Sequence, residues 1–367
     1  MPALAITGAS PRAADTERRI ALWLLACCAM VFLMVAIGGI TRLTESGLSI
    51  TQWQPVAGVI PPLDEAQWAA EFERYKAIPQ YRAIHAGMTL ADFKGIFLWE
   101  YVHRLWGRLI GVAFAVPFIW MLARRQIPLR LAPPLAGIFV LGSLQGAIGW
   151  YMVASGLEDR IEVSQYRLAI HLAAAVAIYA AMLWVALDLL ATRSPHPPAM
   201  RVPPSPARGR GLGRGLRHGA GAVLLLTFIT MVAGSFVAGT RAGYLDNTFP
   251  LMEGRFVPPG YLHLSPWWLN PFETLVAVQF DHRFLAEVTL AAIVALWLVS
   301  RRVDLARGAR LALDALLALA LVQVGLGIAT LLFVVPLPLA VLHQAGGLAL
   351  LTAALVARHR LRTTAPL

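Results

Sequence analysis

Charged residues and cysteines are scarce in this sequence. Only 14% of the 367 residues are Asp, Glu, Lys or Arg, and there are 2 cysteines. A soluble globular domain carries about 25% charged residues, so the composition excludes an ordinary soluble enzyme. Cys27 and Cys28 are adjacent, which prevents them from joining distant parts of an exported loop. We expect both to be small core side chains, and a disulfide-stabilised secreted scaffold is excluded.

Long apolar stretches dominate instead, and 58% of the residues are hydrophobic. A helix that crosses a bilayer needs about 20 apolar residues, and eight stretches reach this length. The sequence therefore predicts an all-α integral membrane protein with eight transmembrane helices. They are expected near residues 20–40, 96–122, 132–152, 167–191, 220–240, 277–299, 311–333 and 338–358.

The net charge of +11 is unevenly divided between the segments that connect these helices. With the N-terminus in the cytoplasm, nineteen Lys and Arg residues fall in cytoplasmic segments, nine in outer loops and three within helices. This bias follows the positive-inside rule and predicts that both termini are cytoplasmic. The basic charge is thus a topology signal, and we expect no nucleic-acid partner. Asp15 and Glu17 argue against an organelle transit peptide, and the first helix is too long for a signal peptide and should stay as an anchor.

A Pro-, Gly- and Arg-rich segment at 192–219 divides the chain into two sets of four helices. Such a composition cannot bury a core and predicts a flexible cytoplasmic linker. We place an N-terminal half at 1–195, the linker at 196–219 and a C-terminal half at 220–367. Four signatures recur in the same order, 199, 179, 178 and 172 residues apart: "GGITR" and "VAGTR", "YVHR" and "FDHR", Gln145 and Gln323, His171 and His343. The repetition predicts two pseudo-symmetric four-helix bundles.

Four of the nine histidines fall within the predicted membrane helices, one on each even-numbered helix. They are His103, His171, His282 and His343, each about four to seven residues from the outer end of its helix. Ionisable groups inside a membrane are costly and usually functional, although a single one can be an interfacial or satisfied bundle histidine. We expect His103 to face His171 and His282 to face His343. The other five, expected to be solvated, are His85, His196, His218, His263 and His359.

Two opposed imidazoles in an apolar bundle suit haem better than zinc, which usually needs three or four protein ligands. Small residues near the histidines would leave room for a flat ring, unless they only allow close helix packing. Propionates need cationic partners at the outer surface, and snorkelling to the interface is the competing explanation for such arginines. The small residues are Gly146, Gly149, Ala173, Ala174, Gly325, Gly327, Gly346 and Gly347, and the arginines are Arg42, Arg104, Arg241 and Arg283.

The two halves differ three residues before the first histidine of each pair. Glu100 precedes His103, whereas Gln279 precedes His282. Positions i and i+3 share a helix face, and a carboxylate can accept a proton or orient water where an amide cannot. We infer that the first half performs chemistry and the second holds a resident haem. The alternative is that Glu100 only pairs with Arg104 on the helix surface.

At these residues the chain resembles the haem A synthase family. The resemblance covers all eight helices and is carried by "GGITRLTESGLSI", "EYVHRLWG", "QGAIGWYMV", "YRLAIH", "GSFVAGTRAGYLDNTFPLM", "QFDHR" and "VQVGLGIATL…VLHQAGG". It implies that His282 and His343 hold a resident haem b, that haem O binds near His103 and His171, and that Glu100 is the essential carboxylate. It also implies oxidation of the C8 methyl group of haem O to the formyl group of haem A by successive hydroxylations.

The resemblance also implies a bacterial inner-membrane location, a haem O-producing farnesyltransferase as supply partner, and an electron acceptor. Residues 41–95 contain no cysteine, as in the cysteine-free type of proteobacteria and mitochondria. We hypothesise that electrons pass from the methyl group through the substrate iron to the second haem, while Glu100 manages the proton or the water. A di-haem electron carrier and a haem transporter are the rival classes, and a homo-oligomer stays open.

The first outer loop carries a further predicted element at 64–81, "DEAQWAAEFERYKAIPQY". Its pattern predicts an amphipathic helix over the first pocket. Trp68, Phe72 and Tyr75 would meet lipid or protein there, either as a lid or as core packing.

Overall fold

The computed structural model describes residues 11–53, 57–157, 161–191 and 207–363. The described chain is all-helical, with eight helices long and apolar enough to cross a membrane, as expected for a multi-pass membrane protein. These are α1 (Pro11–Leu43), α4 (Leu90–Ala123), α5 (Ala132–Ala154), α6 (Gln165–Ala191), α7 (Ala207–Thr240), α9 (Leu275–Ser300), α10 (Arg307–Leu332) and α11 (Leu337–Thr363). Each contains one of the eight apolar stretches, so this prediction is confirmed.

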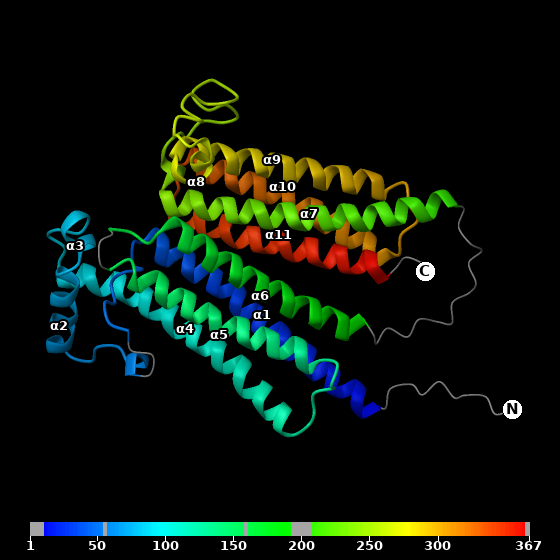
Figure 1. Cartoon of the computed structure of the whole chain (residues 1–367), viewed down its shortest axis with the longest axis horizontal. Helices are drawn as coiled ribbons and strands as arrows, with labels where there is room; N and C mark the ends of the chain where they lie inside the picture. The colour runs from blue at the N-terminus through cyan, green and yellow to red at the C-terminus, as the bar shows by residue number, and fades with distance from the viewer. Residues whose placement is uncertain (1–10, 54–56, 158–160, 192–206, 364–367) are drawn as a thin grey trace.

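The long helices form two groups along the chain (Figure 1). In the first, α1 packs against α4 and α6, and α5 packs against α4 and α6. In the second, α7 packs against α9 and α11, and α10 packs against both. The groups meet where α6 contacts α7 and where α11 contacts α1 and α6. The pseudo-symmetry expected between them stays a prediction.

Short elements cover the end of the bundle opposite to the start of α1 and the finish of α11 (Figure 1). In the first half they are η1 (Ala57–Val59), α2 (Glu65–Lys76) and α3 (Pro79–Ala83), and in the second η2 (Ala242–Tyr244), η3 (Trp267–Leu269) and α8 (Asn270–Glu273). The helix expected over 64–81 is therefore present as α2 and α3. Phe72 and Tyr75 are buried, and both rings stack on Phe93 of α4, so these aromatics meet protein.

One helix begins earlier than the apolar pattern indicates. α4 starts at Leu90 because Thr89 and Asp92 form a capping box, which satisfies free N–H groups at the helix start. Its first turns pack on α2 through Phe93 and Phe97. His103 is consequently thirteen residues from the start of α4, whereas the other three histidines are six or seven residues from the starts of their helices.

The linker is shorter than predicted. α7 begins at Ala207, directly after the last proline of the segment, so residues 207–219 are helical. Proline disrupts a helix interior, whereas single glycines only weaken it. The remaining linker residues, 196–206, lie outside the described residues together with 192–195.

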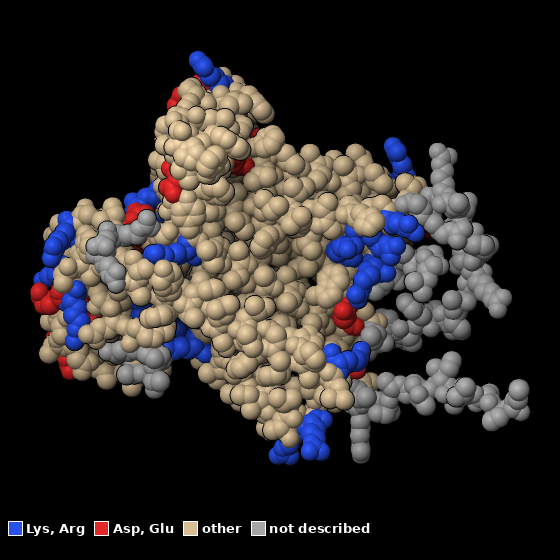
Figure 2. All heavy atoms as spheres, in the orientation of Figure 1, with Lys and Arg blue, Asp and Glu red and all other residues tan. Residues whose placement is uncertain are grey.

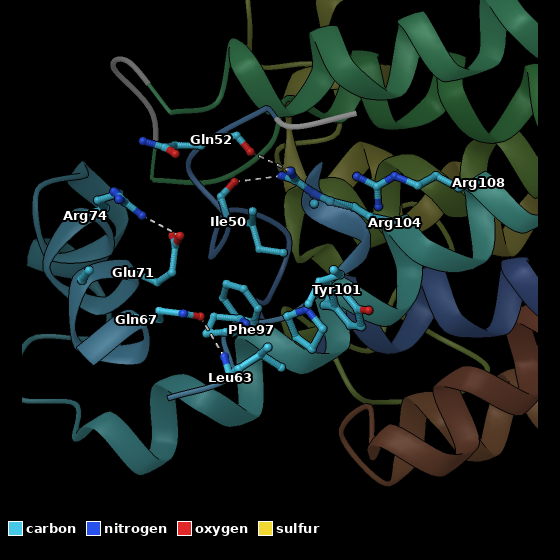
Figure 3. Close-up of a pocket in the computed structure, with 15 residues that line it drawn as sticks. Ile50, Gln52, Leu63, Gln67, Glu71, Arg74, Phe97, Tyr101, Arg104 and Arg108 are labelled. Carbon is cyan, nitrogen blue, oxygen red and sulfur yellow. Dashed lines mark hydrogen bonds and ion pairs between the residues drawn. The ribbon is translucent and has the colours of Figure 1, made fainter. Parts of the chain in front are cut away.

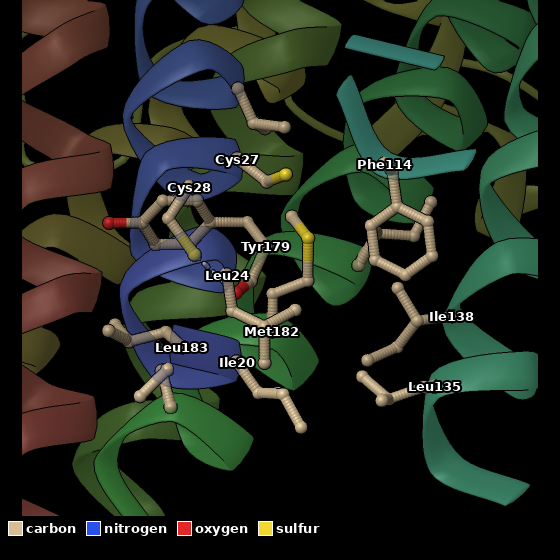
Figure 4. Close-up of a cluster of buried hydrophobic side chains, with 14 of the residues drawn as sticks. Ile20, Leu24, Cys27, Cys28, Phe114, Leu135, Ile138, Tyr179, Met182 and Leu183 are labelled. Carbon is tan, nitrogen blue, oxygen red and sulfur yellow. Dashed lines mark hydrogen bonds between the residues drawn. The ribbon is translucent and has the colours of Figure 1, made fainter. Parts of the chain in front are cut away.

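The largest apolar core lies in the first half and includes part of the second (Figure 4). Cys27 and Cys28 are 1% and 4% exposed within it, which confirms them as core side chains. Leu348, Leu351 and Leu355 of α11 belong to the same cluster. One face of α11 is therefore built into the first half.

Charged side chains gather at the two ends of the molecule and leave an apolar belt between them in this view (Figure 2). Two of the histidines expected to be solvated are exceptions to that expectation. His359 is 2% exposed and lies 2.7 Å from Asp188 of α6. His85 contacts the Tyr75 hydroxyl at 2.5 Å and Glu45 at 3.3 Å, and burial together with nearby acidic charge raises the pKa of Tyr75.

Candidate functional site

Each intramembrane histidine lies against a glycine of a neighbouring helix. A Cβ atom added at these glycines would stand 2.8–3.1 Å from the imidazole Cε1, which is too close for an ordinary contact. The absence of a side chain therefore lets each ring fit beside the neighbouring backbone. The pairs are His103 on Gly38 of α1, His171 on Gly149 of α5, His282 on Gly234 of α7 and His343 on Gly327 of α10.

The second pair of imidazoles is held from both sides. The His282 and His343 ring centroids are 6.3 Å apart, with the ring planes at 81°. His282 Nδ1 lies 3.1 Å from the carbonyl oxygen of Thr230 on α7. The Gln323 amide lies 3.1 Å from His343 Nδ1 and donates to the His343 carbonyl at 2.8 Å. Both rings are thus fixed by partners on adjacent helices.

The first pair has only one such anchor. The Gln145 amide lies 3.1 Å from His171 Nδ1 and donates to the His171 carbonyl at 2.9 Å, as Gln323 does in the second half. The buried Nδ1 of His103 has no hydrogen-bond partner among the described residues. The structure therefore brings His282 and His343 together, whereas the facing of His103 and His171 stays a prediction.

Glu100 is buried and fully engaged beside His103, toward the end of the bundle that carries α2 and α3. The Ser49 hydroxyl and the Ile50 N–H each donate to Glu100 Oε2 at 2.7 Å. Arg104 donates to Glu100 Oε1 at 2.5 Å and to the carbonyl oxygens of Ile50 and Gln52 at 2.8 and 3.3 Å. The pairing of Glu100 with Arg104 is present. Because Glu100 is only 2% exposed, however, the pair lies in the interior and not on the helix surface.

Gln279 and Arg283 both donate hydrogen bonds to the loop around Asp246 and Thr248 in the second half, whereas Glu100 accepts them from the first loop. The Gln279 amide donates to the carbonyl oxygen of Asp246 at 2.9 Å. Arg283 donates to the carbonyl oxygens of Asp246 and Thr248 at 2.6 and 2.8 Å. This loop therefore presents acceptors, whereas the first loop also presents donors. Glu100 can accept from the donors of the first loop, and the Gln279 amide can donate to the acceptors of the second, so each side chain matches its own loop.

Arg42 and Arg241 come together at the junction of the two halves. Arg42 pairs with Glu162 at 2.8 Å and donates to the Gly239 carbonyl at 3.2 Å. Arg241 pairs with Glu45 at 2.6 Å and also with Glu162. Arg241 and Glu45 both have positive φ, +60° and +57°. These arginines join α1 and α7 through shared carboxylates.

A pocket of about 430 Å³ opens beside Arg104, at the end of the first half that carries α2 (Figure 3). Arg104, Arg108 and Tyr101 line it from α4, and Gln67 and Arg74 line it from α2. Apolar walls come from Ile50, Ile60, Leu63 and Phe97. A recess with apolar walls and guanidinium groups suits an amphiphilic anion, because guanidinium binds carboxylates by charge-assisted hydrogen bonds.

Several contacts of the histidine pairs were missed from the sequence. Gly38, Gly234 and Thr230 support histidines, and Ser49 supports Glu100, but none was singled out. The doublet "GG" before "ITR" was the available signal for Gly38. Among the small residues that were named, Gly146 and Gly325 meet no described atom within 4 Å of an added Cβ, and Gly346 and Gly347 accommodate the Gln323 amide.

Comparison with known proteins places the chain. The cytochrome oxidase assembly protein family (COX15-CtaA) matches residues 21–355. A protein of Nitrosospira multiformis named Heme A synthase is 51% identical over 349 residues, covering 94% of each chain. A Heme A synthase of Rhodospirillum centenum is 52% identical over 92% of this chain and 87% of its own. Heme A synthase COX15 of Arabidopsis thaliana is 43% identical over 99% of this chain and 78% of its own.

These matches confirm the resemblance that the helix motifs indicate. They extend over both groups of helices and include all four histidines, because the matched range runs from 21 to 355. The chain belongs to the cytochrome oxidase assembly protein family (COX15-CtaA).

Proposed function

We propose that this protein is a haem A synthase of a bacterial inner membrane, with both termini cytoplasmic. It oxidises the C8 methyl group of haem O to the formyl group of haem A by successive hydroxylations. The observation that carries the proposal is the pair of half-buried imidazole sites, one anchored on both sides and one on a single side. The names of its relatives support the same activity.

The second pair fits a resident haem b. His282 and His343 would hold the iron of this haem through their imidazole nitrogens. The centroids of His282 and His343 are 6.3 Å apart. A histidine ligand usually donates its other N–H to a carbonyl, which fixes its tautomer, and Thr230 offers such a carbonyl to His282. Haem b bound there supplies one-electron redox chemistry.

The first pair fits an exchangeable haem substrate. His103 has no fixed partner at Nδ1 within the described chain, so its ring is held less firmly than His282. A site that binds haem O and releases haem A needs such weaker anchoring. Arg104 and Arg108 line the adjacent pocket and are placed for propionate groups. Arg42, Arg241 and Arg283 remain candidates for the same task, and like Arg104 each already has protein partners.

Glu100 is the candidate catalytic carboxylate. Arg104 and the two donors of the 49–50 segment hold both of its carboxylate oxygens in place. An ionised carboxylate in this position accepts a proton or orients the attacking water. The proposal divides the chain into a substrate half at 1–195, a linker and a haem b half at 220–367. A farnesyltransferase that makes haem O and an electron acceptor complete the pathway.

The test is pigment analysis of Glu100→Gln and Ser49→Ala proteins, produced in a host that makes haem O. Glu100→Gln keeps the size of the side chain but cannot exchange protons, so haem b should be retained and haem A should fall at least a hundredfold. Ser49→Ala removes one hydrogen bond to Glu100 and leaves the carboxylate, so haem A should fall less than tenfold. Extracted haems are separated by chromatography.

Normal haem A from Glu100→Gln would refute the role of the carboxylate. Equal losses of haem A in the two variants would mean that Glu100 only holds the 49–50 loop in place. A wild-type protein that contains haem b but neither haem O nor haem A would favour the di-haem electron carrier.

A further inference from the structure

A contact between α11 and α1 connects the surroundings of the two histidine pairs, although none of the four histidines takes part in it. His343 faces α10, where it meets Gly327 and Gln323. The next residue on α11, Gln344, points about 100° around the helix and reaches α1 of the first half. Its amide donates to the carbonyl oxygen of Val35 at 3.1 Å.

Gln344 lies directly over a glycine of α1. A Cβ atom added at Gly39 would stand 2.3 Å from Gln344 Oε1 and 3.0 Å from its Cδ. The adjacent Gly38 supports the His103 ring, with Cε1 at 3.1 Å from an added Cβ. The Gly38–Gly39 step of α1 therefore has His103 on one side and Gln344 on the other. The residue that contacts His103 and the residue that contacts Gln344, the neighbour of His343, are therefore adjacent in the chain.

The sequence of the other half shows that this contact is not a general feature of the bundle. The glycine that supports His282 as Gly38 supports His103 is Gly234 on α7, and the residue that follows it is Ser235 in place of a second glycine. The residue that follows His171 is Leu172, which packs on the apolar core. The two glycines and the glutamine thus occur together, and only where α1 and α11 meet.

The remaining contacts of α11 keep this crossing in register. Thr352 hydrogen-bonds to Tyr179 of α6 at 2.8 Å, and His359 contacts Asp188 of the same helix. Leu348 and Leu351 lie between Gln344 and Thr352 on α11 and belong to the core of the first half. Polar side chains that bond across helices within a membrane contribute about 1 kcal/mol each. α11 is therefore fixed along its length against the first half.

We infer that Gln344 is a positioning residue that couples the two histidine pairs, because it holds α11 on the Gly38–Gly39 step that supports His103. The test of this inference by haem binding rests on the proposed function. A second test, by NMR of the histidines, rests on the geometry alone. A substitution beside the second pair should therefore disturb the first. Haem at His282 and His343 should stay in place, because Gln344 faces away from that pair.

The experiment is a double-mutant cycle in the full-length protein with Gln344→Ala, Gly39→Ala and the combined variant. Each single change should weaken binding of added haem to the first site on the order of tenfold in Kd, followed by absorption, with the haem b content unchanged. In the combined variant the alanine at 39 occupies the space left by the amide, so its loss should be smaller than the product of the two single losses. Gln344→Met, which keeps the length without the hydrogen bond, separates packing from hydrogen bonding.

Gly111→Ala is the matched control, because an added Cβ there meets no described atom within 4 Å. A second readout does not need haem: NMR of 15N-histidine in the same proteins should show a shifted His103 resonance in Gln344→Ala and an unshifted His171 resonance. An unshifted His103 resonance, or losses that combine as independent effects, would overturn the inference. A wild-type first site that binds no haem would instead contradict the proposed function, and the NMR result would still decide the role of Gln344.

Discussion

The two halves place an imidazole pair in similar surroundings but treat the first histidine of each pair differently. His282 reaches the Thr230 carbonyl, whereas His103 Nδ1 is buried without a hydrogen-bond partner in the described residues. In the first half the Glu100 carboxylate accepts hydrogen bonds from a loop, and in the second half the Gln279 amide donates one to a loop carbonyl. A firmly held ring suits a permanent ligand, and a loosely held one suits a ligand that must leave.

The comparison also changes how the Glu100 and Gln279 difference is read. Sequence reasoning favoured a chemical role for Glu100 and kept a surface pair with Arg104 as the alternative. The structure adds a second cause, because a carboxylate cannot donate to the Asp246 carbonyl and an amide cannot pair with Arg104 as an ion. Stability and activity are therefore both expected to respond at these positions, and they need separate measurements.

The largest effect is expected from removing one histidine of each pair. His282→Ala should lower the haem b content of the purified protein more than tenfold, because it deletes a resident ligand. His103→Ala should leave haem b near the wild-type level and abolish haem A. Haem extraction and chromatography measure both pigments. Equal loss of haem b from the two variants would remove the distinction between the halves.

A smaller effect is expected on stability from exchanging the acid and the amide. Glu100→Gln leaves the partly buried Arg104 without its countercharge and should cost about 2–3 kcal/mol. Gln279→Glu sets a carboxylate against the Asp246 carbonyl and should cost about 1–2 kcal/mol.

Thermal unfolding of the detergent-solubilised proteins measures both costs. Because the two positions share no partner, the losses should add in the double variant. A double variant as stable as the wild type would mean that the two loops do not discriminate between donor and acceptor.

The smallest effect concerns pH and the outer loop of the second half. Burial alone would raise the pKa of Asp246, but hydrogen bonds from Thr248 and the Glu253 N–H and the charge of Arg283 hold it below its usual value. A carboxyl with a lowered pKa stabilises the fold above its ordinary value near 4 and loses this contribution as the pH falls through the lowered value. The wild type should therefore be more stable than Asp246→Asn at pH 6–7, with a difference that shrinks below about pH 4. Melting curves across this range test the point, and a constant difference would contradict it.

The sequence was sufficient for the parts of the fold that depend on composition. Eight apolar stretches predicted eight helices because membrane length and apolar length are directly related. The start of α4 was misplaced because residues 90–96 include Asp92 and Lys94, and their helix depends on a capping box and on packing against α2.

The histidine pairs were predictable as pairs, but their supports were not. Helix periodicity places His103 on a face, yet it does not set the rotation of α1 that brings Gly38 against the ring. The Thr230 carbonyl belongs to the backbone and has no sequence signal at all. Gln145 and Gln323 were noticed as repeated residues, and their contact with the histidines emerged only from the structure.

The placement of α11 has a consequence for the integrity of the molecule. Gln344, Thr352 and His359 all find their partners on helices of the other half. Were the halves to drift apart in the bilayer, these polar groups would face hydrocarbon without hydrogen bonds, which is costly. A protease that severs the connecting segment should therefore yield two fragments that still migrate together through purification.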